Sequence, residues 1–324
     1  MSHRWRGGER RACGDGLTMR LNSLERQVLG DWRDGLAPRL TQPVDDEQWL
    51  RVVLHFALQT SRLVRCDRLG DLDGSVRLKA DRSPVTDLEH RIEQLIADGL
   101  RHLPEPVAFV SEESISEALG PGITLAVDPV DGTWALVNRT EHAATSLALL
   151  RDGVPFIGVV ANPATGEIAY TVDGQVPRLV QLGAFGEADR AVSLPIPRAG
   201  PEGLLVSVHP NRALGDVGVA LATAWRNGEV DMVRSPGGAP TLELLGVAKG
   251  NFAYVNLWNR RRSAPWDLAA GLMLVRAAGG DVVDLDGAPI RAIGHRGPFV
   301  GSLSAVDRER VRSLVRPSLQ PVGG

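Results

Sequence analysis

Apolar and polar residues alternate through the middle of the chain in the manner of β-strands. The runs 146–150 and 156–160 lie on either side of Asp152-Gly153, a pair typical of tight turns, and predict a β-hairpin. Short apolar runs predict three further strands, at residues 107–110, 123–127 and 168–172. The middle of the chain is therefore expected to be rich in strands.

Other segments carry apolar residues at helical spacing. A short amphipathic helix is predicted over 24–32, and a longer one over about 46–64 after a break that contains proline. Thr86 and Glu89 have the spacing of a capping box at the start of a helix. Asp267 opens another periodic segment, which stops at Gly279-Gly280 as helices with a glycine C-cap do.

Towards the C-terminus the two patterns mix. From about residue 203, apolar runs alternate with helical patterns around 217–225 and 242–248. This alternation is typical of α/β segments.

Composition limits the classes of protein to consider. The 324 residues are 43% apolar and 23% charged, which is enough for one large core or two intermediate ones. The net charge of −3 gives no broad basic field, so we expect no nucleic-acid partner. No apolar segment reaches transmembrane length, so we expect no membrane association either. Cys13 and Cys66 give no sign of a designed disulfide, and we expect a cytoplasmic protein.

The first 44 residues differ from the rest and are expected to form a partly mobile extension. Residues 1–20 contain five arginines and four glycines, without the apolar core of a secretory signal. They are interpreted as a mobile tail, or as an overextended start with Met19 as the true initiator.

The strongest chemical signal follows the predicted strand at 123–127. There the sequence reads Asp128-Pro129-Val130-Asp131-Gly132-Thr133, so a buried strand ends in two carboxylates three residues apart. Hard cations such as Mg²⁺ choose carboxylate and carbonyl oxygens, and the N–H groups of Gly132 and Thr133 would suit a phosphate. Asp-Gly pairs are also ordinary turn formers, so this motif alone leaves a decorated turn as an equal alternative.

Three further motifs accompany it. Residues 79–87 read Lys-Ala-Asp-Arg-Ser-Pro-Val-Thr-Asp, residues 111–113 read Ser-Glu-Glu, and residues 264–271 read Ala-Pro-Trp-Asp-Leu-Ala-Ala-Gly. Together, in this order and at about these separations, the four motifs resemble the inositol monophosphatase family of Mg²⁺-dependent phosphatases. The resemblance runs from about residue 50 to residue 305.

Three acidic residues in these motifs also have a physical interpretation of their own. Glu112 follows a predicted strand and would meet Asp128 and Asp131 at a shared sheet edge, although a solvated acidic loop is the alternative. Asp267 lies at a helix start, where aspartate acts more often as a cap than as a ligand. Asp87 lies at the start of the helix predicted from Thr86 and Glu89, so it also has a structural role there. That helix start would at the same time aim the Asp87 carboxylate at the metal site.

The resemblance implies an α/β fold, a layered αβαβα sandwich with the site between its halves. An α+β half over 45–195 would carry most metal ligands, and an α/β half over 196–324 would carry the Trp-Asp ligand and substrate contacts. A homodimer is also implied. Two or three Mg²⁺ ions would be held by Glu112, Asp128, Asp131, Asp267 and the carbonyl of Val130.

The resemblance also assigns catalytic and substrate-binding roles. Asp87 and Thr133 would position and activate the attacking water, with Glu112 as a further catalytic residue. The expected substrate-binding residues are Asp131, Gly132, Thr133, Gly238, Arg260 and Asp267. The reaction would be hydrolysis of a phosphate monoester by a water that the metal ions activate, without a phospho-enzyme.

One departure from the family pattern concerns the substrate. Inositol-specific members carry a glutamate shortly before the Trp-Asp motif, whereas this chain has Asn259-Arg260-Arg261-Arg262, with Leu257 or Arg260 nearest that position. The arginines would suit a second anionic group, or they lie in a solvated loop. His209 and Arg212 are interpreted as ordinary loop residues, with a contact to the substrate as the alternative.

Three functions therefore remain. The first is hydrolysis of a small alcohol phosphate, such as a sugar, cyclitol, nucleoside or histidinol phosphate. The second is a 3'(2'),5'-bisphosphate nucleotidase or sugar bisphosphatase, and the third is a non-catalytic metal- or ligand-binding relative.

Overall fold

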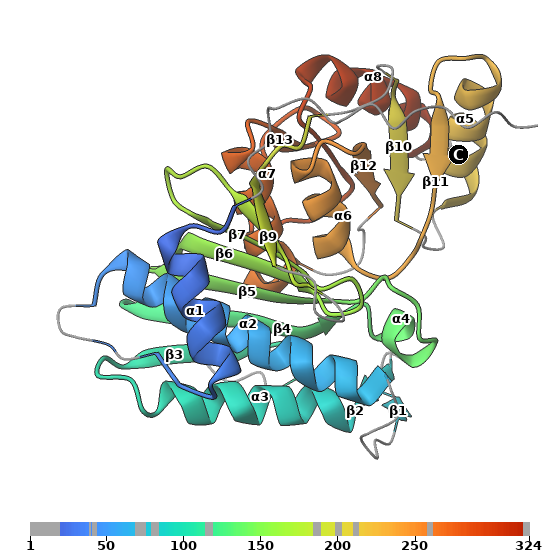
Figure 1. Ribbon diagram of the computed structural model, residues 1–324. Coiled ribbons are helices and arrows are strands. Elements are labelled where there is room, and N and C mark those ends of the chain that lie inside the picture. The colour runs from blue at the N-terminus through green and yellow to red at the C-terminus, as the bar shows by residue number, and fades with distance from the viewer. Residues whose placement is uncertain are drawn as a thin grey trace, which may run out of the picture.

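Five layers of helices and sheets make up the protein, as the computed structural model in Figure 1 shows. The structure describes residues 20–38, 40, 44–68, 76–78, 84–113, 119–183, 189–197, 203–209, 214–257 and 262–319. In this part of the chain the layers are helices, a large sheet, helices, a smaller sheet and helices. The layered sandwich predicted from the motifs is confirmed.

The larger sheet contains seven of the described strands, in the order β3-β4-β5-β6-β7-β8-β9. Strands β3 and β4 are parallel, and all other neighbours are antiparallel. The predicted hairpin is β5 and β6, whose turn places Asp152 at φ 51° and Gly153 at φ 79°. The strands are β3 (Val107–Ser111), β4 (Ile123–Asp131), β5 (Ala144–Arg151), β6 (Val154–Asn162), β7 (Glu167–Val172), β8 (Arg178–Gln181) and β9 (Arg190–Ser193).

Strand alternation gives this sheet two apolar faces. Leu125 and Leu147 point into one hydrophobic core, whereas Ala126 and Ala148 point into a second one. The first core lies under the outer helices α1 (Ser23–Arg33), α2 (Asp46–Arg68) and α3 (Asp87–Leu100). All three helices were predicted, and α2 runs four residues beyond its predicted end.

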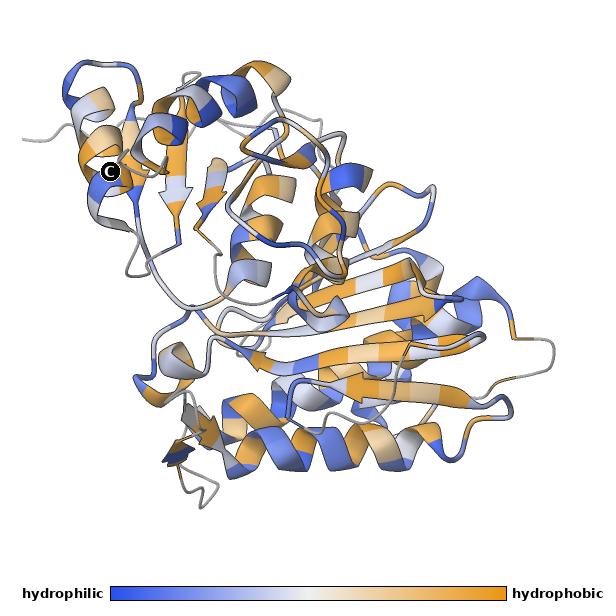
Figure 2. Ribbon diagram, turned by 180° about the vertical axis from the view of Figure 1, so that it is seen from behind, coloured by the Kyte–Doolittle hydropathy of each residue, from blue (hydrophilic) through white to orange (hydrophobic). Residues whose placement is uncertain are grey.

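The second core lies between the two sheets and is filled by helices α6 (Pro240–Ala248) and α7 (Pro265–Ala277). Close approach here depends on glycine: a Cβ on Gly158 would lie 3.0 Å from the Cα of Ala270, and one on Gly271 would lie 2.6 Å from a methyl of Leu244. Hydrophobic residues accordingly concentrate on the strands and on these inner helices (Figure 2).

The smaller sheet has the order β11-β10-β12-β14-β13, with β10 parallel to both β11 and β12. Its outer face packs on α5 (Leu214–Arg226) and α8 (Ala305–Val315), and the short helix η1 (Arg316–Leu319) follows α8. Its strands are β10 (Leu205–Val208), β11 (Met232–Arg234), β12 (Ala253–Asn256), β13 (Asp281–Asp284) and β14 (Phe299–Ser302). The α/β pattern predicted after residue 203 is confirmed.

Three small elements lie beside the carboxyl end of β4. Strands β1 (Val76–Leu78) and β2 (Pro84–Thr86) form an antiparallel pair, and the one-turn helix α4 (Thr133–Val137) contacts β2.

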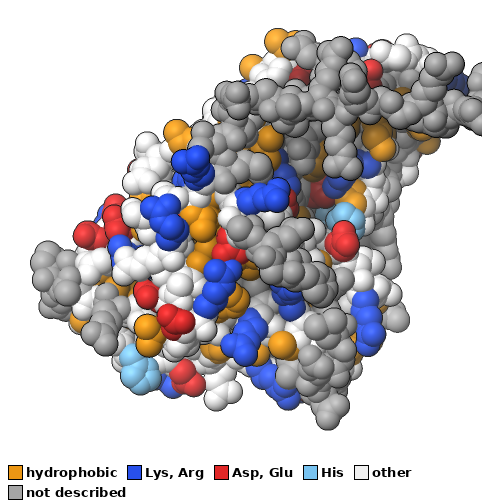
Figure 3. All heavy atoms as spheres, viewed as in Figure 1, with side chains coloured by type: hydrophobic (Ala, Val, Ile, Leu, Met, Phe, Trp, Pro, Cys, Tyr) orange, Lys and Arg blue, Asp and Glu red, His pale blue; other side chains and the backbone are white. Residues whose placement is uncertain are grey.

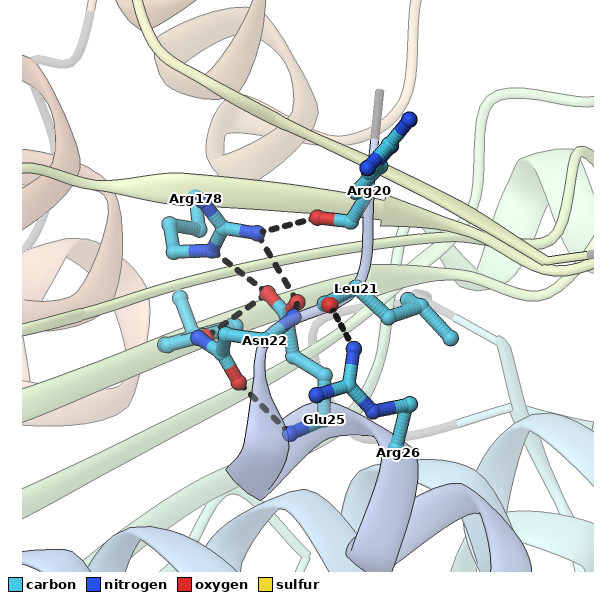
Figure 4. A network of polar contacts seen from close by, with 7 residues as sticks. Arg20, Leu21, Asn22, Glu25, Arg26 and Arg178 are labelled. Atoms are coloured by element: carbon cyan, nitrogen blue, oxygen red, sulfur yellow. Dashed lines mark hydrogen bonds and ion pairs between the residues drawn. The ribbon is translucent and has the colours of Figure 1, made fainter. Parts of the chain in front are cut away.

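Helix α1 is fixed to the large sheet by a buried ion pair (Figure 4). The Arg178 guanidinium donates to both carboxylate oxygens of Glu25, at 2.6 and 2.8 Å, and Tyr170 donates its hydroxyl to the same carboxylate at 2.8 Å. Glu25 also accepts the N–H of Asn22 in a capping box. Every acceptor position of this 2% exposed glutamate is therefore used.

Several other expectations can be compared with the structure. Cys66 is a free thiol, whereas Cys13 and the expected mobile tail lie outside the described residues. None of the helices in the described residues is long and apolar enough to cross a membrane. Basic side chains lie interspersed with acidic and apolar ones on the face in Figure 3. The predicted boundary between the two halves, at residue 195, falls between β9 and β10 and stays a prediction. The cytoplasmic location also stays a prediction.

Candidate active site

The acidic site begins where β3 and β4 end side by side. These strands are parallel, with Ser111 opposite Val127, so the residues that follow them leave the sheet at the same edge. The N–H of Glu112 donates to the carbonyl of Val127 at 3.3 Å. The Glu112 and Asp128 carboxyl groups consequently lie within hydrogen-bond distance of each other.

A β-bulge lets β4 bring two carboxylates, instead of one, to the same cluster. In a regular strand, residues three apart point to opposite faces. Here the register of β4 against β5 shifts between Asp128 and Asp131, and Val130 donates its N–H to Asp128 Oδ1 at 3.0 Å. The bulge re-aims the chain, and both carboxylates reach the same acidic cluster.

Helix α7 brings the fourth carboxylate from far along the sequence. Asp267 is the third residue of α7, is 7% exposed, and accepts the N–H of Ala264 at 2.6 Å. The start of the helix is tied to β5, because Ser146 donates its hydroxyl to the carbonyl of Trp266 at 3.1 Å. Asp267 therefore caps its helix and also lies close enough to Asp128 to raise its pKa.

Helix α6 contributes a contact that the sequence motifs did not indicate. Thr241, which is fully buried, donates its N–H to Asp131 Oδ2 at 2.8 Å, and its hydroxyl donates to the same oxygen. The N-termini of α6 and α7 thus both lie beside the carboxylates, where the helix dipole favours negative charge.

Burial and the neighbouring carboxylates raise the pKa of Asp128 and Asp131. Burial, then the charges of Glu112, Asp131 and Asp267, raises the pKa of Asp128 well above its usual value. Burial also raises the pKa of Asp131 to about 7, although the two hydrogen bonds from Thr241 lower it. Such a cluster is costly unless protons or cations neutralise it.

The donor set fits a hard divalent cation. All four side chains offer carboxylate oxygens, the ligand type that Mg²⁺ prefers. Within the described residues, no three acidic, histidine or cysteine side chains are already arranged as a set of metal ligands. Two of the oxygens are in use, because Asp131 accepts from Thr241 and Asp267 accepts from Ala264.

Thr133 and its neighbours form the other side of the site. The Thr133 hydroxyl donates to Glu89 Oε1 at 2.8 Å and lies 3.3 Å from the carbonyl of Val130. Burial raises the pKa of Glu89 to about 7. Asp87, the first residue of α3, forms an ion pair with Arg77 at 2.8 Å.

The turn after Asp131 requires glycine. Gly132 adopts φ 89° and Gly238 adopts φ 102°, conformations that L side chains rarely adopt. A Cβ on either residue would approach the carbonyl oxygen of His142, at 2.7 Å for Gly132 and 2.9 Å for Gly238. The two glycines bring the 132–133 turn and the start of α6 into contact.

Comparison with known proteins assigns this arrangement to a family. The model of the inositol monophosphatase family matches residues 45–318. The chain belongs to the inositol monophosphatase family. It is a phosphatase that hydrolyses phosphate monoesters, as the resemblance of the four motifs predicted.

Relatives within the family carry several names. An inositol-1-monophosphatase of Rhizobium meliloti is 33% identical over 214 residues, which cover 65% of this chain and 76% of the relative. A histidinol-phosphatase of Mycobacterium tuberculosis is 31% identical over 267 residues, which cover 80% of this chain and 93% of the relative.

Solved structures of the family confirm the fold. The Thermotoga maritima inositol monophosphatase aligns with a TM-score of 0.66 and 24% identity over 85% of this chain and 99% of that one. An inositol monophosphatase/NADP phosphatase solved with Mg²⁺ and phosphate aligns with a TM-score of 0.63 and 22% identity, over 86% of this chain and 97% of that one.

The site residues expected from the family motifs fall into two groups. Glu112, Asp128, Asp131 and Asp267 lie together, and Thr133, Gly132 and Gly238 border them. Arg260 lies outside the described residues, as do Arg212 and Lys79, and Arg262 is exposed. The roles assigned to all of these residues stay predictions.

One further polar residue was missed. Asn256 ends β12, is fully buried, and donates its Nδ2 to the Tyr254 hydroxyl at 2.8 Å. Its Oδ1 has no hydrogen-bond partner among the described residues. Burial, then the charges of Glu243 and Asp131, raises the pKa of Tyr254, which places this pair near the acidic cluster.

Proposed function

We propose that this phosphatase hydrolyses a small alcohol phosphate in a Mg²⁺-dependent reaction at the acidic cluster. The observation that carries the proposal is the convergence of four carboxylates from β3, β4 and α7 beside the glycine turn at 132. A buried cluster of this kind is stable in its ionised form only with cations to neutralise it. Two or three Mg²⁺ ions match the number of carboxylates.

The proposed ligands are Glu112, Asp128, Asp131, Asp267 and the carbonyl of Val130. When bound, Mg²⁺ would lower the pKa of a water and neutralise charge on the leaving oxygen. The protein's part is to hold the ligands: Thr241 fixes Asp131, and the Asp128 turn presents the Val130 carbonyl.

Thr133 would orient the attacking water. Because its hydroxyl donates to Glu89, the lone pairs of its oxygen are left to accept a hydrogen bond from a water. Asp87 would accept the second hydrogen of that water, and the N–H groups of Gly132 and Thr133 would hold the phosphate. Glu112 would orient the same water through a carboxylate oxygen.

The alcohol part of the substrate is proposed to meet Asn256. The buried Asn256 Oδ1 would accept a hydrogen bond from a hydroxyl or an amine of the substrate. Alcohol monophosphates and bisphosphates both carry such donors, so this contact leaves both substrate classes open. A role for Arg260 with a second phosphate stays a prediction.

A homodimer is the proposed assembly. Four large apolar side chains are exposed on neighbouring elements near the site, where a second copy would cover them. They are Val76 (53% exposed), Leu78 (63%), Trp134 (58%) and Val137 (37%). Light scattering during size exclusion tests this, and a monomer at every concentration would contradict it.

Release of inorganic phosphate from a substrate panel tests the reaction. The panel holds inositol, sugar, nucleoside and histidinol phosphates together with a nucleoside bisphosphate, each with Mg²⁺ and with EDTA. We expect Mg²⁺-dependent release from a monophosphate. Silence across the panel from folded protein would instead support a non-catalytic relative.

A further inference from the structure

A cavity lies at the end of the large sheet that is opposite to the acidic site. Strand β4 brings Asp131 to the acidic site where it pairs with Ala144, at the start of β5. The cavity lies where β5 ends and β6 begins, beside Gly153 and Val154. Its volume is about 890 Å³, within the range of about 300–1,000 Å³ that small-molecule sites occupy. Well-packed interiors leave few voids larger than a water molecule, so this cavity is not ordinary packing.

Helix α7 reaches both the cavity and the acidic site. The helix packs on β4, β5, β6 and β7 of the large sheet. Its third residue, Asp267, belongs to the acidic cluster, whereas Arg276 near its end lines the cavity. At 1.5 Å per residue these two positions lie about 13.5 Å apart along the helix. The cavity is therefore a separate place on the molecule.

The cavity has an apolar floor and an apolar rim. The floor is formed by α7 and by the segment that follows β13, where Leu272 is fully buried and Ile290 is 3% exposed. Two turns of the large sheet form the rim, and each carries a largely exposed valine, Val154 (66%) before β6 and Val176 (63%) before β8. Apolar surface that is left in water favours a ligand with an apolar body.

Hydrogen bonds fix the walls of the cavity. In the turn after β7, the N–H of Asp173 donates to the carbonyl of Phe156 at 2.8 Å. In the opposite wall, the N–H of Ile290 donates to the carbonyl of Val282 at 3.0 Å, and the Arg276 guanidinium donates to the carbonyl of Ile290 at 2.7 Å. Walls that are already ordered reduce the entropy that a ligand must lose for the protein on binding.

The charged groups of the lining favour an anion. Arg276 and Arg291 line the cavity together with one carboxylate residue, Asp173. Arg276 is paired with Asp281 at 3.2 Å. The Arg291 side chain is exposed and forms no ion pair or hydrogen bond with the part of the chain that the structure describes. A guanidinium in this setting pairs well with a carboxylate.

We propose that this cavity binds an apolar carboxylate, whose apolar body packs on α7 and whose carboxylate pairs with Arg291. A small alcohol phosphate lacks the apolar body that the floor and rim require, so the ligand is not the substrate of the acidic site. A concave site of this volume suits a small molecule better than a flat partner surface. The proposal does not depend on the proposed function, because no residue of the cavity belongs to the acidic cluster.

Fluorescence titration with anilinonaphthalene sulfonate, an apolar anion, tests the proposal. Decanoate is then added to displace the fluorophore, and decanol serves as the uncharged control of the same chain length. All titrations contain EDTA, so that no cation at the acidic site attracts the anions. Met273→Trp fills the cavity from α7, and Arg291→Ala removes the proposed ion pair. Arg226→Ala is the matched control, an exposed arginine at the end of α5.

The expected results follow from the two parts of the site. Wild-type protein binds the fluorophore at one saturable site, and decanoate displaces it about fivefold or more better than decanol does. Met273→Trp weakens binding about tenfold or more, because the indole occupies the space of the apolar body. Arg291→Ala weakens it about fivefold or more, and Arg226→Ala leaves it within about twofold. Asp173→Asn removes the opposing carboxylate and leaves binding equal or tighter.

Several outcomes overturn the proposal. Binding that Met273→Trp and Arg291→Ala both leave unchanged lies elsewhere on the protein, and a fluorophore that decanoate does not displace excludes the carboxylate. Absence of saturable binding to folded wild-type protein also overturns it; light scattering that then shows a dimer, dissociated by Met273→Trp, assigns the cavity to a second copy of the chain. If Met273→Trp does not fold, Val176→Glu on the exposed rim replaces it, and unchanged binding there overturns the proposal.

Discussion

Replacing Asp128 by asparagine is expected to stabilise the metal-free protein while abolishing turnover. Asp128 is 4% exposed and lies among the charges of Glu112, Asp131 and Asp267. Ionising it without a cation costs free energy, and asparagine removes that cost while keeping an oxygen for the N–H of Val130. The same change removes a proposed Mg²⁺ ligand.

The size of the effect can be worked from the neighbouring Asp131. Burial raises its pKa from 3.8 to about 7, and at about 1.36 kcal/mol per pKa unit this corresponds to about 4 kcal/mol at neutral pH. The pKa of Asp128 is raised in the same direction. Because the carboxylates titrate together and share this cost, we expect Asp128→Asn to raise the free energy of unfolding by about 2–4 kcal/mol, or Tm by about 5–10 °C.

The pH dependence has a definite sign. A carboxyl group whose folded-state pKa lies above its unfolded value destabilises the fold at every pH above the unfolded pKa, because the unfolded chain releases its proton more readily. The cost is therefore absent below about pH 4, grows as the pH rises towards the folded pKa of about 7, and is largest above it. The stability difference between Asp128→Asn and wild type should widen over this range.

Thermal unfolding from pH 4 to pH 8, with EDTA and with Mg²⁺, measures the effect. Mg²⁺ at about 100 times its Kd should stabilise the wild type by about 2.7 kcal/mol and the variant by much less. Asp173→Asn, the same charge change at an exposed turn, should stay within about 0.5 kcal/mol of wild type. A variant less stable than wild type in EDTA at pH 8, or one that still releases phosphate with Mg²⁺, would refute the reasoning.

Three further substitutions test the packing around the site. Gly132 has φ 89°, and a Cβ there would lie 2.7 Å from a carbonyl oxygen, so Gly132→Ala should lower the free energy of unfolding by more than about 2 kcal/mol and remove most of the phosphate release. Gly153 has φ 79° but lies in open space, so Gly153→Ala should lower the free energy of unfolding by about 1 kcal/mol and leave the activity intact. Arg178→Ala leaves the buried Glu25 carboxylate with only Tyr170 and Asn22 as donors, so denaturant unfolding should show a loss of about 1.5–3 kcal/mol; an unchanged free energy of unfolding would contradict a stabilising ion pair. Thr241→Val removes a hydroxyl donor from a proposed ligand and should lower kcat/KM about tenfold, with the thermal midpoint within a few degrees; unchanged kinetics would count against that contact.

Much of the fold was predictable because its elements are locally consistent. The hairpin of β5 and β6 carried both the alternation and the turn residues, and the capping box of α3 was visible in Thr86 and Glu89. Strand β4 is longer than its apolar run, because pairing with β5 extends it through Asp128 to Asp131. Local pattern does not reveal pairing of that kind.

The sequence predicted which acidic residues belong to the candidate site, but it did not predict the contacts that hold them. Glu112, Asp128 and Asp267 were predicted because they lie at strand ends or at a helix start. Nothing in the sequence around Thr241 indicated that it contacts Asp131, which lies 110 positions earlier. The contacts of Glu93 with the Glu112 segment were equally invisible in the sequence, because they depend on how α3 lies across the sheet.

The sequence by itself determined the family, the β5–β6 hairpin, the outer helices and the residue types of the candidate site, since motifs, hydrophobic period and turn residues are all local properties. The tertiary structure alone decided how these carboxylates meet. A bulge turned Asp131 to the same cluster as Asp128, and packing of α6 and α7 between two sheets delivered Thr241 and Asp267. The reason is physical: a strand fixes the direction of a side chain relative to its own sheet, but only the burial of two apolar faces against a shared helix layer fixes one sheet relative to the other.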